Sequence, residues 1–148
     1  MRNLKLLFVF AGFCLVFSCS DEEILDRKED KITGTWYFDK AFYKTDHALF
    51  RTNVIEDYAG DFITFYPDYT AIYEDRSLNA VFDGDWSLFL DRYDDGEKIF
   101  TMEMIFYDYV NRSDFVYFGE MTRISRNNIT LKVRDDRGEY TFKLDKLN

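Results

Sequence analysis

One cysteine near the start of the chain has the surroundings of a covalently modified residue. Basic residues precede an apolar run at residues 6–17, and the small residue Ser18 stands directly before Cys19. A basic start, an apolar stretch too short to cross a bilayer comfortably and a small residue at the cleavage position indicate a secretory signal. We therefore predict a lipoprotein signal peptide over residues 1–18, with diacylglycerol and acyl chains attached covalently at Cys19. An uncleaved anchor helix is the alternative.

The residues that follow this cysteine bear on where the protein is sent. They form one polar and acidic run: Ser20, Asp21, Glu22 and Glu23. The run resembles the export signal that Bacteroidota place after the lipidated cysteine of lipoproteins bound for the outer face of the outer membrane. The resemblance implies a lipid-anchored protein at the cell surface. The alternatives are a solvated acidic tether and periplasmic residence.

The other reactive side chains do not form a recognisable catalytic set. His47 is the single histidine, no Gly-x-Ser-x-Gly motif occurs, and acylation of Cys19 leaves no free thiol in the mature chain. With 28 acidic residues, chance carboxylate pairs are plentiful, so a glycosidase has no specific support. One turn concentrates oxygen ligands in a pattern that suits a hairpin better than an EF-hand: Asp91, Asp94, Asp95 and Glu97. We predict a non-enzyme without metal or other cofactor.

Charge and size limit the partners and the number of domains. Removal of residues 1–18 changes the net charge from −9 to about −11, which argues against nucleic acid as a partner. The mature chain of about 130 residues suffices for one hydrophobic core. We expect an acidic tether at residues 19–32, in which Ile24 and Leu25 could dock or start a helical turn, and one domain at residues 33–148. Fully extended, this tether would reach roughly 40 Å.

Alternation of apolar and polar residues dominates the chain after the tether. Gly34, Trp36, Phe38 and Phe42 are predicted to share one face of the first strand. Seven further alternating segments follow, separated by short turns, near residues 63–65, 69–73, 82–90, 98–109, 115–124, 129–133 and 140–144. The pattern predicts an all-β fold, an eight-stranded antiparallel up-and-down β-barrel, with a two-sheet sandwich as the alternative. Residues 44–60 fit neither period, so they are predicted to be an extra strand, a short helix or a loop.

Short motifs on this strand plan carry a family resemblance. Gly34-Thr35-Trp36, the hairpin sequence at residues 63–70 and Gly84-Asp85-Trp86 resemble lipocalin-like lipoproteins of Bacteroidota, although Tyr69 stands where those usually have glycine. The resemblance implies a cup-shaped barrel that holds a small apolar or amphipathic ligand.

The candidate ligand-lining residues are large and apolar or aromatic: Trp36, Trp86, Phe100, Met102, Met104, Phe106, Tyr117 and Met121. A solid core built from the same residues is the alternative. In that case the protein would be an interaction module for an envelope protein partner or an accessory carbohydrate binder. For the latter, the alternation places four tyrosines on the outer face: Tyr37, Tyr43, Tyr107 and Tyr109.

Overall fold

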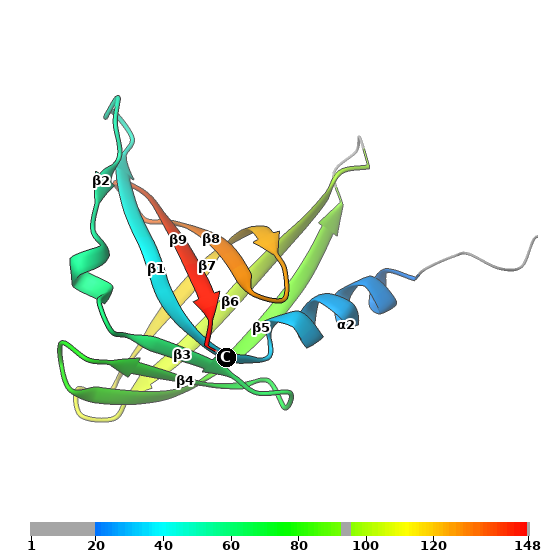
Figure 1. Ribbon diagram of the computed structural model, residues 1–148, viewed down its shortest axis with the longest axis horizontal. Helices are drawn as coiled ribbons and strands as arrows, with labels where there is room; N and C mark the ends of the chain where they lie inside the picture. The colour runs from blue at the N-terminus through cyan, green and yellow to red at the C-terminus, as the bar shows by residue number, and fades with distance from the viewer. Residues whose placement is uncertain (1–19, 93–95, 148) are drawn as a thin grey trace, which may run out of the picture.

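The computed structural model describes residues 20–92 and 96–147 (Figure 1). One helix, α2 (Asp21–Ile32), precedes the strands. The remaining elements are β1 (Gly34–Thr45), β2 (Thr52–Asn53), the 3-10 helix η1 (Ile55–Tyr58), β3 (Phe62–Phe65), β4 (Thr70–Asp75), β5 (Ala80–Arg92), β6 (Lys98–Asp108), β7 (Ser113–Ile124), β8 (Asn128–Arg134) and β9 (Gly138–Lys146).

Eight of these strands close into an antiparallel barrel. Each strand from β3 to β8 pairs with the strand that follows it, and β1 pairs with both β3 and β9 to complete the ring. This closure confirms the predicted eight-stranded all-β barrel and is compatible with a lipocalin-like arrangement. The connection at residues 44–60 contains the short strand β2 and the 3-10 helix η1. Strand β2 pairs with the C-terminal part of β1.

A β-bulge in β1 changes which side chains face the interior. The ladder between β1 and β9 shifts by one residue between Phe38 and Lys40. Before the bulge, Trp36 and Phe38 are buried; after it, the buried residue is Ala41, which lies opposite Phe142. One inserted residue moves every following side chain to the other face of a strand.

The predicted faces of the next two residues are therefore wrong. Phe42 lies outside the barrel, where the Arg51 guanidinium stacks over its ring at 3.9 Å. Tyr43 lies on the interior side, and its ring packs against Tyr140 of β9 with a centroid distance of 4.4 Å.

The segment predicted to be a tether, in which Ile24 and Leu25 could dock or start a helical turn, is a helix from Asp21 to Ile32. The Ser20 hydroxyl accepts a hydrogen bond from the Glu23 amide at 3.2 Å, which caps the helix. Asp21 forms ion pairs with Arg92 and, at 3.5 Å, with Lys98 across the β5–β6 hairpin. The hydrogen bond from Arg92 lowers the pKa of Asp21 below its usual value.

The last turns of α2 pack on the barrel. Ile32 is fully buried, Leu25 packs against the core, and the Trp36 indole donates a hydrogen bond to the Ile32 carbonyl oxygen at 2.6 Å. The Tyr69 hydroxyl donates to the Glu29 carboxylate at 2.9 Å. Twelve helical residues span about 18 Å, so the segment is less than half as long as an extended tether would be.

Candidate functional site

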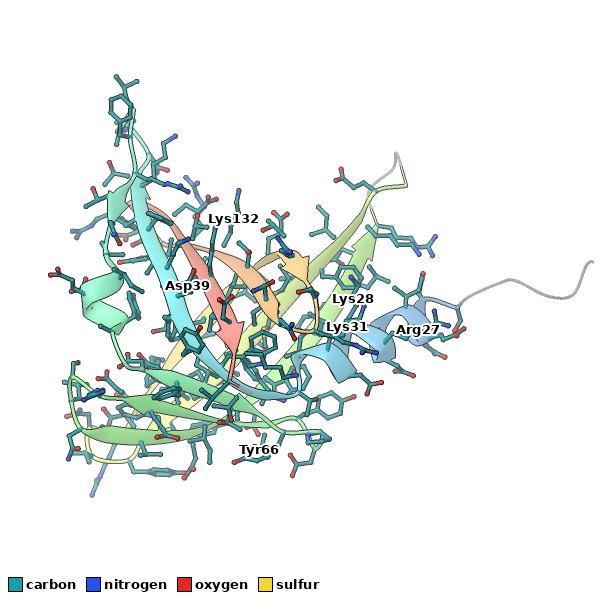
Figure 2. All side chains as sticks on the ribbon, in the orientation of Figure 1. Arg27, Lys28, Lys31, Asp39, Tyr66 and Lys132 are labelled. Atoms are coloured by element: carbon teal, nitrogen blue, oxygen red, sulfur yellow. The ribbon has the colours of Figure 1, made fainter. Side chains whose placement is uncertain are left out.

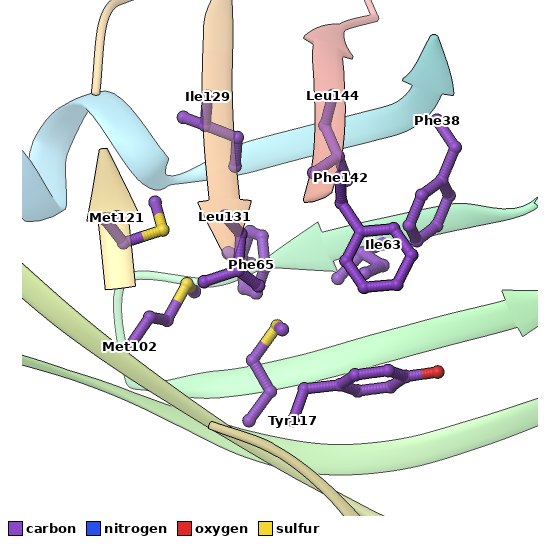
Figure 3. Close-up of a pocket in the computed structure, with 11 residues that line it drawn as sticks. Phe38, Ile63, Phe65, Met102, Tyr117, Met121, Ile129, Leu131, Phe142 and Leu144 are labelled. Carbon is purple, nitrogen blue, oxygen red and sulfur yellow. The ribbon is translucent and has the colours of Figure 1, made fainter. Parts of the chain in front are cut away.

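The barrel interior is filled almost completely by its own side chains. The enclosed space has a volume of about 10 Å³, which is about enough for one water molecule. Six strands contribute the lining side chains (Figure 3): Phe38, Ile63, Phe65, Met102, Met104, Tyr117, Met121, Ile129, Leu131, Phe142 and Leu144. A ligand larger than a water molecule could enter this space only if the packed side chains moved.

The predicted lining residues fall into two groups. Met102, Met104, Tyr117 and Met121 surround the interior space, and Met104 lies opposite Tyr117 in the β6–β7 ladder. The remaining four have other surroundings. Phe106 is buried among aromatic rings, and Phe100 is half-buried, with the Lys28 ammonium of α2 5.1 Å from the centre of its ring.

The two tryptophans close the barrel near α2. Trp36 donates to the Ile32 carbonyl oxygen, and Trp86 donates to the Tyr66 carbonyl oxygen at 3.0 Å. Gly84 lies beside Trp86, and a Cβ at this position would lie 2.1 Å from the backbone oxygen of Ile105. This close approach explains the glycine of the second Gly-x-Trp motif.

One carboxylate is buried at the barrel wall near three tyrosines, of which Tyr73 is buried and Tyr58 and Tyr117 are half-buried. Asp61 is almost fully buried and accepts hydrogen bonds from the Tyr73 hydroxyl at 2.6 Å and the Arg76 amide at 2.9 Å. Burial raises the pKa of Tyr58 and Tyr73 well above the usual value and that of Tyr117 to about 12. Among these hydroxyl groups, that of Tyr73 is tied to the buried carboxylate of Asp61.

The outer face of β4, β5 and β6 carries a groove with a volume of about 350 Å³. Three tyrosines line it: Tyr66 follows β3 (Figure 2), Tyr107 lies on β6, and Tyr109 lies just beyond β6. Tyr109 is 72% exposed, and its ring centroid lies 6.4 Å from that of Tyr107. The groove therefore presents aromatic faces to solvent.

Two carboxylates share this groove. Asp83 lies directly opposite Tyr107 in the β5–β6 ladder, and Asp85 accepts a hydrogen bond from the Tyr107 hydroxyl at 2.7 Å. That hydrogen bond raises the pKa of Tyr107. The lining contains no lysine or arginine among the described residues. The arrangement can bind a ligand through ring stacking and through hydrogen-bond acceptors.

The sequence identified only part of this groove. Tyr107 and Tyr109 were predicted on the outer face, whereas Tyr66, Asp83 and Asp85 were not connected with them. The alternating pattern of β5 could have revealed the rest of the groove, because it places both aspartates outward. The pairing of β5 with β6 then brings them beside Tyr107.

Some predicted features lie outside the described residues, namely the signal peptide, Cys19 and the acids at positions 94 and 95. Among residues 20–92 and 96–147, no group of three His, Cys, Asp or Glu side chains is placed to hold a metal ion. In the same part of the chain, no helix has the length and apolarity needed to cross a membrane.

Comparison with known protein families, curated proteins and solved structures found no match to the chain.

Proposed function

We propose that this protein is a lipid-anchored, non-catalytic envelope protein that binds a neutral saccharide in the outer groove of β4, β5 and β6. The observation that carries the proposal is the grouping of Tyr66, Tyr107 and Tyr109 with two exposed carboxylates in one groove of about 350 Å³. Aromatic rings offer flat apolar faces for the C–H surface of a pyranose, and carboxylates accept hydrogen bonds from its hydroxyl groups.

The charge of the groove selects the class of saccharide. Asp83 and Asp85 are exposed, and no cation lines the groove among the described residues, so an anionic sugar would be repelled. Neutral sugars avoid this repulsion. The strongly negative chain adds to the same preference.

An apolar ligand inside the barrel, which the sequence also suggested, has weaker support. The interior space of about 10 Å³ is far below the several hundred Å³ of a typical ligand pocket. The outer groove is already open, so binding there requires no displacement of packed side chains.

The anchor part of the proposal rests on Cys19 and the apolar run before it. Cys19→Ser should abolish acyl labelling and release the protein from the membrane fraction. Labelling with a fatty-acid analogue and fractionation test this part separately from saccharide binding. Protease treatment of intact cells distinguishes the proposed cell-surface location from a periplasmic one.

Affinity electrophoresis against neutral polysaccharides tests the groove. The probes are a β-glucan, a xylan, a galactomannan and amylose, with an acidic pectin as the charge control. Truncating an aromatic anchor typically costs more than 1 kcal/mol, so Tyr107→Ala combined with Tyr109→Ala should weaken binding about tenfold or more. Tyr37→Ala, on β1, is the matched control and should leave binding unchanged.

The outcomes separate the parts of this proposal. Retention by none of the neutral probes, or equal losses in the groove variant and in Tyr37→Ala, would overturn saccharide binding in the groove. New reducing ends in the bound polysaccharide would contradict the non-catalytic assignment, because they report bond cleavage.

A second candidate function is docking on an envelope protein through the tip between β1 and β2. Leu49 and Phe50 are 88% and 84% exposed at this tip, which projects from the barrel in Figure 1. Large apolar side chains at an exposed tip suit insertion into a pocket of a partner. Co-purification from membranes should lose a specific protein in Leu49→Ser combined with Phe50→Ser, but not in Leu78→Ser, an exposed leucine in the β4–β5 turn. Identical partner sets would exclude this function.

A further inference from the structure

A cleft between α2 and the β7–β8 turn has a positive lining in an otherwise acidic protein. Its volume is about 590 Å³. The lining comes from three separate segments: Arg27, Asp30 and Lys31 of α2, Arg126 and Asn127 of the turn, and Lys146 of β9. Four cations therefore face one acid, in a chain whose net charge is −9. Figure 2 shows Arg27 and Lys31 on the helix, where a spacing of four residues places them on one face.

The ammonium group of Lys146 is held in place at the inner wall of this cleft. It donates hydrogen bonds to the carbonyl oxygens of Lys31 at 3.1 Å and Thr33 at 2.5 Å, and it lies 5.0 Å from the centre of the Trp36 ring. Burial lowers the pKa of Lys146. These contacts are to neutral groups, so its positive charge is not neutralised by them.

Two other cations have side chains free for a ligand. Lys31 and Arg126 make no side-chain hydrogen bond or ion pair with the described part of the chain, whereas Arg27 pairs with Glu23. The pKa of the adjacent Lys28 is lowered by burial and by the charge of Lys31. The cations on this side of α2 therefore repel one another, and an anion would relieve that repulsion.

We propose that this cleft binds a phosphate group, with Arg126 and Lys31 as the principal contacts and Lys146 as a fixed charge behind them. A guanidinium group can donate to two phosphate oxygens at once, and ammonium groups add point charges. The phosphate can belong to a lipid headgroup or to a free phosphorylated solute. The headgroup source rests on the proposed anchor at Cys19, because α2 begins two residues after it and Lys31 lies only about 15 Å along the helix from Asp21. The site itself does not depend on the anchor or on the saccharide groove.

Titration of the acylated full chain, extracted in a neutral detergent, tests the site. Sodium phosphate and glycerol 3-phosphate are the probes, and backbone amide shifts in α2 and at residues 125–127 are the readout. One cation near an anionic surface contributes about fivefold to binding, so Lys31→Gln with Arg126→Gln should weaken binding about thirtyfold. Lys44→Gln with Arg112→Gln removes the same charge elsewhere and should have little effect. Added salt should weaken binding by the native chain.

Reconstitution then identifies the source of the phosphate. In phosphatidylcholine vesicles that contain phosphatidylglycerol, a headgroup ligand protects α2 and residues 125–127 from hydrogen exchange more than in phosphatidylcholine alone. A free-solute ligand gives the same shifts with glycerol 3-phosphate but no such difference between vesicles. No binding of either soluble probe together with no difference between vesicles, or equal losses in both double variants, would overturn the proposal. Circular dichroism of each variant verifies that it is folded.

Discussion

Met104→Ala distinguishes a solid barrel from one that opens for a ligand. Met104 is 3% exposed and borders an interior space of only about 10 Å³. The substitution removes three buried heavy atoms, which costs about 2.4 kcal/mol at 0.8 kcal/mol per methylene-sized group. The closed barrel limits collapse, and a remaining cavity of about 50 Å³ adds about 1 kcal/mol at 24 cal/mol per Å³. The expected destabilisation is therefore about 3–4 kcal/mol.

Urea denaturation followed by circular dichroism measures this loss. With a slope of about 2 kcal/mol per molar urea, the midpoint should fall by about 1.5–2 M. Leu78→Ala, at an exposed site, should change stability by less than about 0.5 kcal/mol. The new cavity should also bind xenon, which should stabilise the variant and not the native chain. A loss below about 1 kcal/mol, or stabilisation of the native chain by xenon, would show that the interior already opens.

Three further predictions concern the network and the packing. Stability should fall as pH rises above about 10, because Tyr58, Tyr73 and Tyr117 have higher pKa values in the folded chain and therefore lose their protons at lower pH in the unfolded chain. Urea midpoints at pH 9 to 11 measure this decline, and Tyr117→Phe should make it shallower. Asp61→Ala should cost about 2–5 kcal/mol, because the buried Tyr73 hydroxyl and the part-buried Arg76 amide lose their acceptor. Asp61→Asn should cost less, and equal losses would contradict this account. Gly84→Ala should lower the melting temperature strongly, because its Cβ would overlap the Ile105 oxygen; an unchanged melting temperature would show that β6 can move away.

The strand plan could be predicted because alternation reports directly which face of a strand is buried. The same alternation placed Met102 and Met104 on one face of β6 and facing Tyr117, as observed. It failed after Phe38, because an inserted residue in a bulge leaves no mark in the apolar pattern itself. Whether the interior is open also could not be predicted, since filled and hollow barrels use the same inward residues.

Of helix α2, only a possible short helical turn at Ile24 and Leu25 was predicted. Ser20 followed by Glu23 is a capping-box spacing, which predicts a helix start, but the acids were interpreted as an export signal. The two interpretations use the same residues. The contacts that fix the helix come from distant parts of the chain, such as Arg92 and Tyr69, and no local pattern reveals them.

The attachment of α2 at both ends has a consequence for how the protein would sample its environment. If Cys19 is the anchor, a flexible linker would let the barrel reorient freely above the bilayer. A helix packed on the barrel instead restricts the orientation of the barrel relative to the membrane. The groove proposed to bind a saccharide would then face a polysaccharide in a restricted range of orientations. Loss of the exposed ion pairs of Asp21 would loosen only the start of α2, because Ile32 and the Tyr69–Glu29 hydrogen bond would still hold its last turns on the barrel.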